Sequence, residues 1–225
     1  MTHFTKSTFA FLAELAANNN RDWFEANKAR YEADVKGPFL ELIAALQPGL
    51  KKINPAIVAD PKPNGGSMMR IHRDTRFSKD KSPYKTFVAA HFAHMAGKGE
   101  GTPGYYLRIE PGGSMAGGGM WQPGGDALKQ VRDAIVDDPK SWAKAVAGQS
   151  VGRMCQFAGE SLKRPPAGYD PAHAYIEDIK RKDFAVFVSM ADAEVCRADF
   201  KDAVLEQYRA AAPFIRFLSD AVGLD

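Results

Sequence analysis

The sequence contains few cysteines and no long apolar run. Cys155 and Cys196 are its only cysteines and form no Cys-x-x-Cys pair, which argues against a disulfide framework or a thiolate zinc site and favours free thiols in a reducing cytosol. The apolar stretch near the N-terminus is broken by Glu14 and preceded by Lys6 alone, so no secretory signal is predicted. No segment reaches the roughly 18 apolar residues of a membrane span. We therefore expect a soluble, cytoplasmic protein without a membrane partner.

The excess of basic residues is small and concentrated in one place. Lysine and arginine total 30 against 27 aspartates and glutamates, a net charge of +3, which alone does not indicate a nucleic-acid partner. Between residues 70 and 85 six basic residues face two acidic ones. This segment therefore carries +4, and the remainder of the chain carries −1.

The order of sequence patterns predicts the fold class. Apolar residues repeat at helical spacing in the first third, glycine clusters separate short β-prone runs in the middle, and helical spacing returns at the end. Connections this short favour antiparallel hairpins over parallel crossovers. We predict one α+β domain over residues 1–225, helical in 1–60, sheet-forming in 65–122, and mixed then helical in 125–225. The sheet should be mostly antiparallel and flanked by N-terminal and C-terminal helices.

Individual elements follow from the same patterns. Strands are predicted at residues 67–74, 86–94, 104–110, 114–121 and 185–188. Turn residues predict a hairpin at 111–113, and the glycines at 117–119 suggest a bulge or a close backbone approach. Asn19 and Asp22 resemble a capping box. The pair Gly37-Pro38 should interrupt the helix before it, and Pro213 should kink the last helix.

The most unusual segment runs from Arg70 to Lys85. If it is extended, Arg70, His72, Asp74 and Arg76 project from one face, and Phe77 shares the mostly apolar, core-facing side. Arginines this close repel one another unless anions lie between them, and the two local acids are too few. Guanidinium groups bind phosphate or carboxylate through paired hydrogen bonds, and a lysine or a tyrosine hydroxyl can complete such a site.

This segment predicts an electropositive pocket for a small phosphorylated or carboxylated ligand. The proposed ligand-binding residues are Arg70, Arg73, Arg76, Lys81 and Tyr84. Asp74 would orient the arginines, and in an enzyme Asp74 or Asp80 would be the acid–base group. Two alternatives stay open. The same residues can form the internal salt-bridge network of a structural or interaction protein, or they can bind nucleic acid with Phe77, Tyr84 and Phe87 as stacking rings.

The sequence predicts no metal centre and identifies no cofactor. His91 and His94 would share a helix face, but they fall on opposite faces of the predicted strand. His72, two residues from Asp74, is interpreted as a surface histidine. Neither a phosphate-binding P-loop nor a Gly-x-Ser-x-Gly nucleophile motif occurs.

Eight residues of the basic segment are similar to the signature of a known family. They are Arg70, Arg73, Asp74, Arg76, Phe77, Asp80, Lys81 and Tyr84, spaced R-x-x-R-D-x-R-F-x-x-D-K-x-x-Y in this chain. The family they resemble is a widespread group of bacterial proteins of about this length whose function is unknown. Residues 19–24 (NNRDWF) resemble its N-terminal signature, and residues 162–170 and 180–184 resemble its C-terminal half. The resemblance implies membership along nearly the whole chain and implies no activity.

Overall fold

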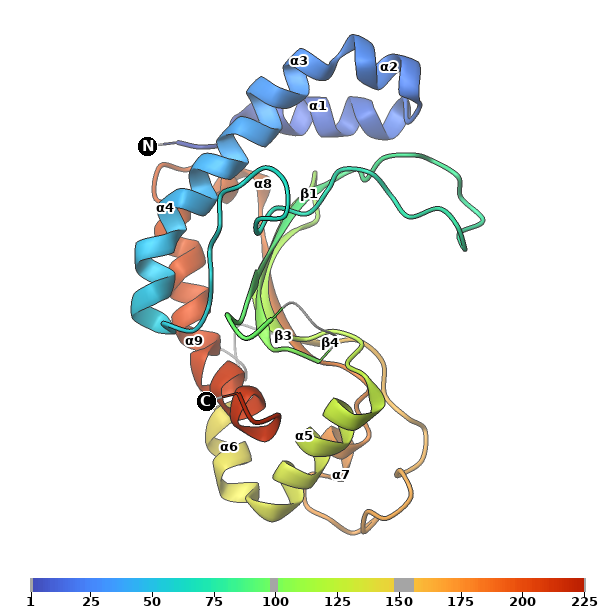
Figure 1. Ribbon diagram of the computed structural model, residues 1–225, viewed down its shortest axis with the longest axis vertical. Helices are drawn as coiled ribbons and strands as arrows, with labels where there is room; N and C mark the ends of the chain where they lie inside the picture. The colour runs from blue at the N-terminus through green and yellow to red at the C-terminus, as the bar shows by residue number, and fades with distance from the viewer. Residues whose placement is uncertain (1, 98–100, 148–155, 225) are drawn as a thin grey trace.

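Helices precede and follow a sheet, in the α+β arrangement that the sequence predicts. The computed structural model describes residues 2–97, 101–147 and 156–224 (Figure 1); Cys155 and part of the glycine cluster at 97–101 lie outside them. The helices are α1 Lys6–Ala17, α2 Arg21–Ala26, α3 Lys28–Tyr31, the π-helical η1 Glu32–Lys36, α4 Gly37–Ile53, α5 Gly125–Asp137, α6 Pro139–Ala147, α7 Ile176–Ile179, α8 Asp192–Val195 and α9 Phe200–Ala221. The strands are β1 Val88–Ala93, β2 Gly104–Ile109, β3 Ser114–Met120, β4 Gln156–Ala158 and β5 Phe184–Met190.

The five strands form one antiparallel sheet in the order β1-β2-β3-β5-β4. β2 and β3 form the predicted hairpin, in which the Gly113 N–H donates to the Glu110 carbonyl at 3.0 Å. Gly112 has φ +64°, a conformation that glycine adopts without a steric penalty. β3 then pairs with β5 in unbroken register from Ser114 to Met120. The glycine triplet of β3 therefore contains no bulge.

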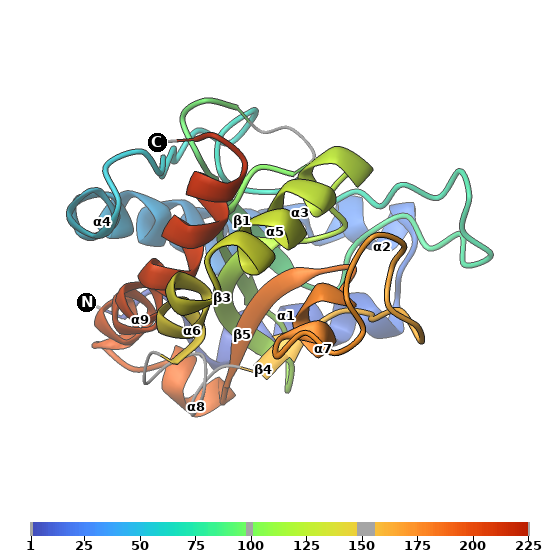
Figure 2. The same cartoon turned by 90° about the horizontal axis from the view of Figure 1, so that it is seen from below.

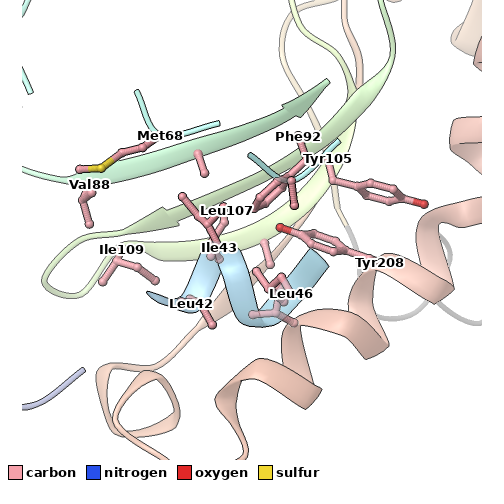
Figure 3. Packing of buried hydrophobic residues seen from close by; sticks show 14 of the residues in the cluster. Leu42, Ile43, Leu46, Met68, Val88, Phe92, Tyr105, Leu107, Ile109 and Tyr208 are labelled. Carbon is pink, nitrogen blue, oxygen red and sulfur yellow. The ribbon is translucent and has the colours of Figure 1, made fainter. Parts of the chain in front are cut away.

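Helices α4 and α9 cover one face of this sheet (Figure 1). Figure 3 shows side chains of both helices meeting the strands in a buried cluster, with Leu42, Ile43 and Leu46 from α4, Tyr208 from α9, and Tyr105, Leu107 and Ile109 from β2. Each buried side chain of this size contributes about 1.5–3 kcal/mol. The Tyr208 hydroxyl donates to the Tyr106 carbonyl at 3.1 Å, which fixes α9 to β2. None of the helices in the described part of the chain is long and apolar enough to cross a membrane.

The C-terminal half is fixed by a tryptophan and a buried arginine. α6 lies beside α9 (Figure 2), with the Trp142 ring centroid 5.1 Å from that of Phe217 and 6.0 Å from that of Phe214. Arg132 of α5 is buried and donates to the carbonyls of Ile179 at 2.7 Å and Arg181 at 2.9 Å. These contacts attach α6 to α9, and α5 to the segment that leads into β5.

Two predictions for the N-terminal helices are wrong. The chain stays helical from Lys28 to Ile53, because η1 absorbs the expected interruption through a hydrogen bond from the Gly37 N–H to the Glu32 carbonyl. Pro38 then falls in the first turn of α4, where its missing N–H is not needed. The cap of α2 is Asn20 rather than Asn19, since the Asn20 Oδ1 accepts from the Trp23 N–H at 2.9 Å.

The strand predicted at residues 67–74 is also wrong. Only the isolated pairs Met68 with Ala90 and His72 with Tyr84 are present there. Beyond Met69 the chain leaves the sheet edge and turns back on itself, with the Arg73 N–H donating to the Pro83 carbonyl at 2.9 Å. Proline has no N–H to donate in return, so a regular ladder cannot continue. The segment is an irregular hairpin, and β1 begins only at Val88.

Candidate functional site

The basic segment forms a loop that projects from the sheet on the side opposite to α4 and α9 (Figure 1). We call residues 70–85 the arginine loop. Its two arms are joined by the Arg73–Pro83 hydrogen bond and by one from the Lys85 N–H to the Ile71 carbonyl at 2.8 Å. The Lys85 Nζ also donates to the Arg70 carbonyl at 2.8 Å. The base of the loop is therefore held by several backbone contacts.

Asn19 connects this loop to the N-terminal helices. Its Nδ2 donates to the Tyr84 carbonyl at 2.9 Å, and its Oδ1 accepts from the Tyr84 N–H at 3.0 Å. The amide side chain thus satisfies both backbone groups of Tyr84, as a neighbouring strand would. The buried Tyr84 ring stacks on Phe24 of α2, with centroids 4.1 Å apart and planes at 21°. As a result, α2 lies directly against the arginine loop.

Replacing Asn19 by alanine is expected to weaken this junction. The variant loses two partly buried hydrogen bonds and leaves the Tyr84 backbone without them, so we expect a loss of about 1–3 kcal/mol in unfolding free energy. Urea denaturation followed by circular dichroism measures it. Asn18→Ala is the control, because the Asn18 side chain makes only an exposed bond to the Glu14 carbonyl. Equal losses in the two variants would contradict the role given to Asn19.

A hollow of about 460 Å³ lies between α2 and the arginine loop. It is lined by Arg21, Glu25, His72, Arg73, Thr75, Lys81, Pro83 and Tyr84. Three cations face one carboxylate in this lining, since the only acid is Glu25. We call this cavity the loop hollow. Its positive lining and its size are suited to a small anion.

The predicted site residues divide into two groups. Arg73, Lys81 and Tyr84 line the loop hollow, whereas Arg70 and Arg76 do not. Arg76 instead binds Asp74 through two parallel contacts, from Nε to Oδ1 at 3.0 Å and from Nη2 to Oδ2 at 2.7 Å. Among the described residues, Asp74 therefore forms an ion pair with Arg76 alone and makes no hydrogen bond to Arg21 or Arg73 of the hollow.

The cations that line the loop hollow also differ in whether they form ion pairs with other described residues. Arg73 pairs with Asp80, while Lys81 Nζ donates to the Thr75 carbonyl at 2.9 Å. Arg21 and Lys81 form no ion pair with any described residue, although both line the loop hollow. Two of its three cations thus keep their charge available to a ligand.

Asp74 and Asp80, the suggested acid–base groups, are held in the charged form. Hydrogen bonds from Arg76 lower the pKa of Asp74 to about 2. Hydrogen bonds from Arg73 and then from Ser82 lower the pKa of Asp80 well below its usual range. A carboxylate with such a low pKa is a poor proton acceptor at neutral pH. These lowered pKa values therefore argue against proton transfer by these two groups.

His94 and the glycines at 117–119, which the sequence analysis also considered, have structural roles. His94 is buried, and its Nδ1 accepts from the Ala96 N–H at 3.2 Å. Within residues 2–97, 101–147 and 156–224, no group of three or more histidines, cysteines or acids is placed to hold a metal ion. The glycines at 117–119 allow β5 and β2 to approach β3, because an added Cβ at each would meet backbone atoms of those strands.

Comparison with protein-family models matches residues 7–217 to a family described as conserved hypothetical protein (DUF2461). The chain belongs to this family. The DUF2461 match includes α2 and the arginine loop, and so both sides of the loop hollow. No curated protein and no solved structure matches the chain.

Sequence reasoning missed one cation of the loop hollow in this DUF2461 protein. Arg21 was recognised as part of the NNRDWF segment but not as a ligand-binding residue, because it lies 52 positions before Arg73. An indication in the sequence was Asn19, because its side-chain amide can form hydrogen bonds with backbone groups of a segment far away in the sequence. Nothing in the local pattern, however, identifies Tyr84 as its partner.

Proposed function

We propose that this protein binds a small phosphorylated or carboxylated molecule in the loop hollow. The observation that carries the proposal is that Arg21 and Lys81 line this cavity without an ion-pair partner among the described residues. Arg73 contributes a third charge, and the Tyr84 hydroxyl can donate a hydrogen bond. Binding pockets for small molecules commonly have volumes of about 300–1,000 Å³, which accommodates this one.

A second cavity shows why the loop hollow is preferred. It has a volume of about 440 Å³ and lies along α8 and the start of α9, lined by Glu194, Asp199, Asp202 and Glu206 together with two arginines. Four carboxylates outnumber two cations there, and Arg197 is already paired with Asp199. An anion would be repelled from that lining and attracted to the loop hollow.

The main alternative is a purely structural network in the arginine loop. The Arg76–Asp74 and Arg73–Asp80 pairs favour it, since they involve both local acids. One partner of each pair is well exposed, however, with the Arg76 side chain at 77% and that of Asp80 at 58% of full exposure, while Asp74 is at 42% and Arg73 at 29%. Ion pairs in contact with water contribute little to stability. Stability alone therefore does not account for the cluster.

Thermal melts of matched variants test the proposal. Inorganic phosphate, glycerol 3-phosphate and succinate serve as probes. A probe at 100 times its Kd stabilises the folded protein by about 2.7 kcal/mol, so the melting temperature should rise by roughly 5–10 °C. We expect this rise to disappear in Arg21→Met and Lys81→Met. It should persist in the controls Arg70→Met and Lys79→Met, whose cations belong to the arginine loop but do not line the hollow. Equal responses in all four variants, or none in the unaltered protein, would contradict the proposal.

A further inference from the structure

The second face of the sheet is not covered by any described helix (Figure 1). Strand register places four residues of this face in one row across the sheet, because His91 pairs with Tyr106, Tyr106 with Gly117, and Gly117 with Phe187. The three side chains of the row are each partly exposed. The row thus presents rings from β1, β2 and β5 on an open, curved surface.

Gly117 brings two of these rings together. A Cβ at this position would lie 2.7 Å from Cδ1 of Phe187, so the phenylalanine ring extends over the glycine. The centroids of the Phe187 and Tyr106 rings are 5.8 Å apart, with planes at 70°. An edge-to-face pair of this kind is a rigid apolar surface. Its position on an uncovered face leaves it available to a flat partner group.

The arginine loop extends from the edge of the sheet and carries a third feature. Phe77 is 94% exposed, more than any other large apolar residue among those described. Its ring lies 5.7 Å from the guanidinium carbon of Arg76. The surrounding backbone is held by the Lys81–Thr75 hydrogen bond and by one from the Ser82 N–H to Asp80 at 2.9 Å. The structure therefore holds a phenylalanine in water, which marks an interaction site.

Cations lie at both ends of this surface. Arg70 and Lys79 of the arginine loop, and Lys163 and Arg164 of the loop beyond β4, are exposed and form no ion pair with any described residue. Figure 1 shows these two loops extending to the same side, one above and one below the uncovered sheet face. The arrangement of rings with flanking cations is complementary to a chain of bases linked by phosphates.

We propose that the uncovered sheet face and the tip of the arginine loop bind single-stranded nucleic acid. Bases stack on Phe77 and on the Tyr106–Phe187 pair, while phosphates contact the flanking cations. Aromatic rings on the open face of a sheet are a recurrent way of holding unpaired bases, whereas paired bases hide their faces within a duplex. This proposal goes beyond the small anion of the loop hollow, because neither Phe77 nor the sheet row lines that cavity.

An anionic membrane is the competing partner for a basic loop with an exposed ring. The observations favour nucleic acid, because the loop tip offers a single apolar side chain and membrane binding strengthens with the apolar area that is buried. The sheet row, in addition, lies on a concave face that a flat bilayer does not reach (Figure 1). Membrane binding therefore becomes an outcome of the test.

Fluorescence anisotropy tests the proposal with labelled 12-nucleotide RNA and DNA single strands of mixed sequence and with the corresponding DNA duplex. We expect either single strand to bind more tightly than the duplex, with an affinity that falls as sodium chloride rises from 50 to 200 mM. Phe77→Leu keeps an apolar side chain without a flat ring and should weaken binding about 5- to 150-fold, the effect of one lost stacking contact. Phe77→Trp should restore it, and Tyr106→Leu should weaken it to a similar extent.

Two controls make the result decisive. Val136→Ala removes an exposed apolar side chain of α5 and should leave oligonucleotide affinity unchanged. Phe77→Leu should retain the melting response to inorganic phosphate, so that failure of this proposal is distinguishable from failure of the loop-hollow proposal. Equal binding of duplex and single strand, or unchanged affinity in Phe77→Leu or in a folded Tyr106→Leu, overturns the inference. So does binding to phosphatidylserine vesicles in the absence of oligonucleotide binding.

Discussion

Replacing Gly117 by alanine is expected to lower the unfolding free energy by about 3 kcal/mol, at the upper end of what overpacking usually costs. The added Cβ would lie 1.9 Å from the Val186 carbonyl oxygen and 2.8 Å from the Phe187 Cα. These are backbone atoms of β5, so they cannot move aside without disturbing the pairing of β3 with β5 at the centre of the sheet. Urea denaturation measures the loss, which is a large share of a typical 5–15 kcal/mol.

Gly125→Ala is the matched control for this experiment. Gly125 is the first residue of α5, and an added Cβ there would meet no heavy atom within 4 Å. Alanine also favours the helical conformation more than glycine does. We therefore expect this variant to be at least as stable as the unaltered protein. A Gly117→Ala protein of unchanged stability would show that β3 and β5 tolerate a wider separation.

The parts of the fold that depend on residues close together in the sequence could be predicted from it. β2 and β3 begin at the predicted residues and end one residue early, because a hairpin is specified by its own turn and by alternation within its strands. The position of each of these elements follows from the spacing of its apolar residues and from the turn residues next to it.

Elements that depend on distant partners could not be predicted in this way. The alternation of charged and apolar residues at 67–74 is typical of a strand, yet it does not say whether a partner strand is present. The arginine loop is held by Asn19, which lies 65 residues from Tyr84. The same alternation placed Phe77 on a core-facing side, whereas the projecting loop exposes it. A period of two predicts which residues share a face but not what that face contacts.

The candidate site shows the same division. The sequence predicted a charge cluster, and the structure places Arg73, Lys81 and Tyr84 around one hollow. Arg70 and Arg76, which the sequence also assigned to the pocket, do not line this hollow, and Arg76 forms its ion pair with Asp74. Arg21 joins the hollow only because the Tyr84 ring stacks on Phe24 and brings α2 to the loop.

Tyr84 therefore combines a structural role with a proposed binding role, and two substitutions separate them. Tyr84→Ala removes a buried ring from its stack with Phe24 and leaves a cavity, so we expect a loss of about 3–5 kcal/mol in unfolding free energy. Because this stack attaches α2 to the arginine loop, the variant should also lose the melting response to inorganic phosphate.

Tyr84→Phe keeps the ring and removes only the hydroxyl, which forms no hydrogen bond with any described residue. Its unfolding free energy should remain close to that of the unaltered protein, because no bond within the described structure is broken. If the hydroxyl donates to an anion in the loop hollow, the Kd for phosphate should rise about 2- to 12-fold, the equivalent of a single hydrogen bond of about 0.5–1.5 kcal/mol. Isothermal titration measures this change. An unchanged Kd together with unchanged stability would restrict Tyr84 to its structural role and leave Arg21, Arg73 and Lys81 as the binding groups.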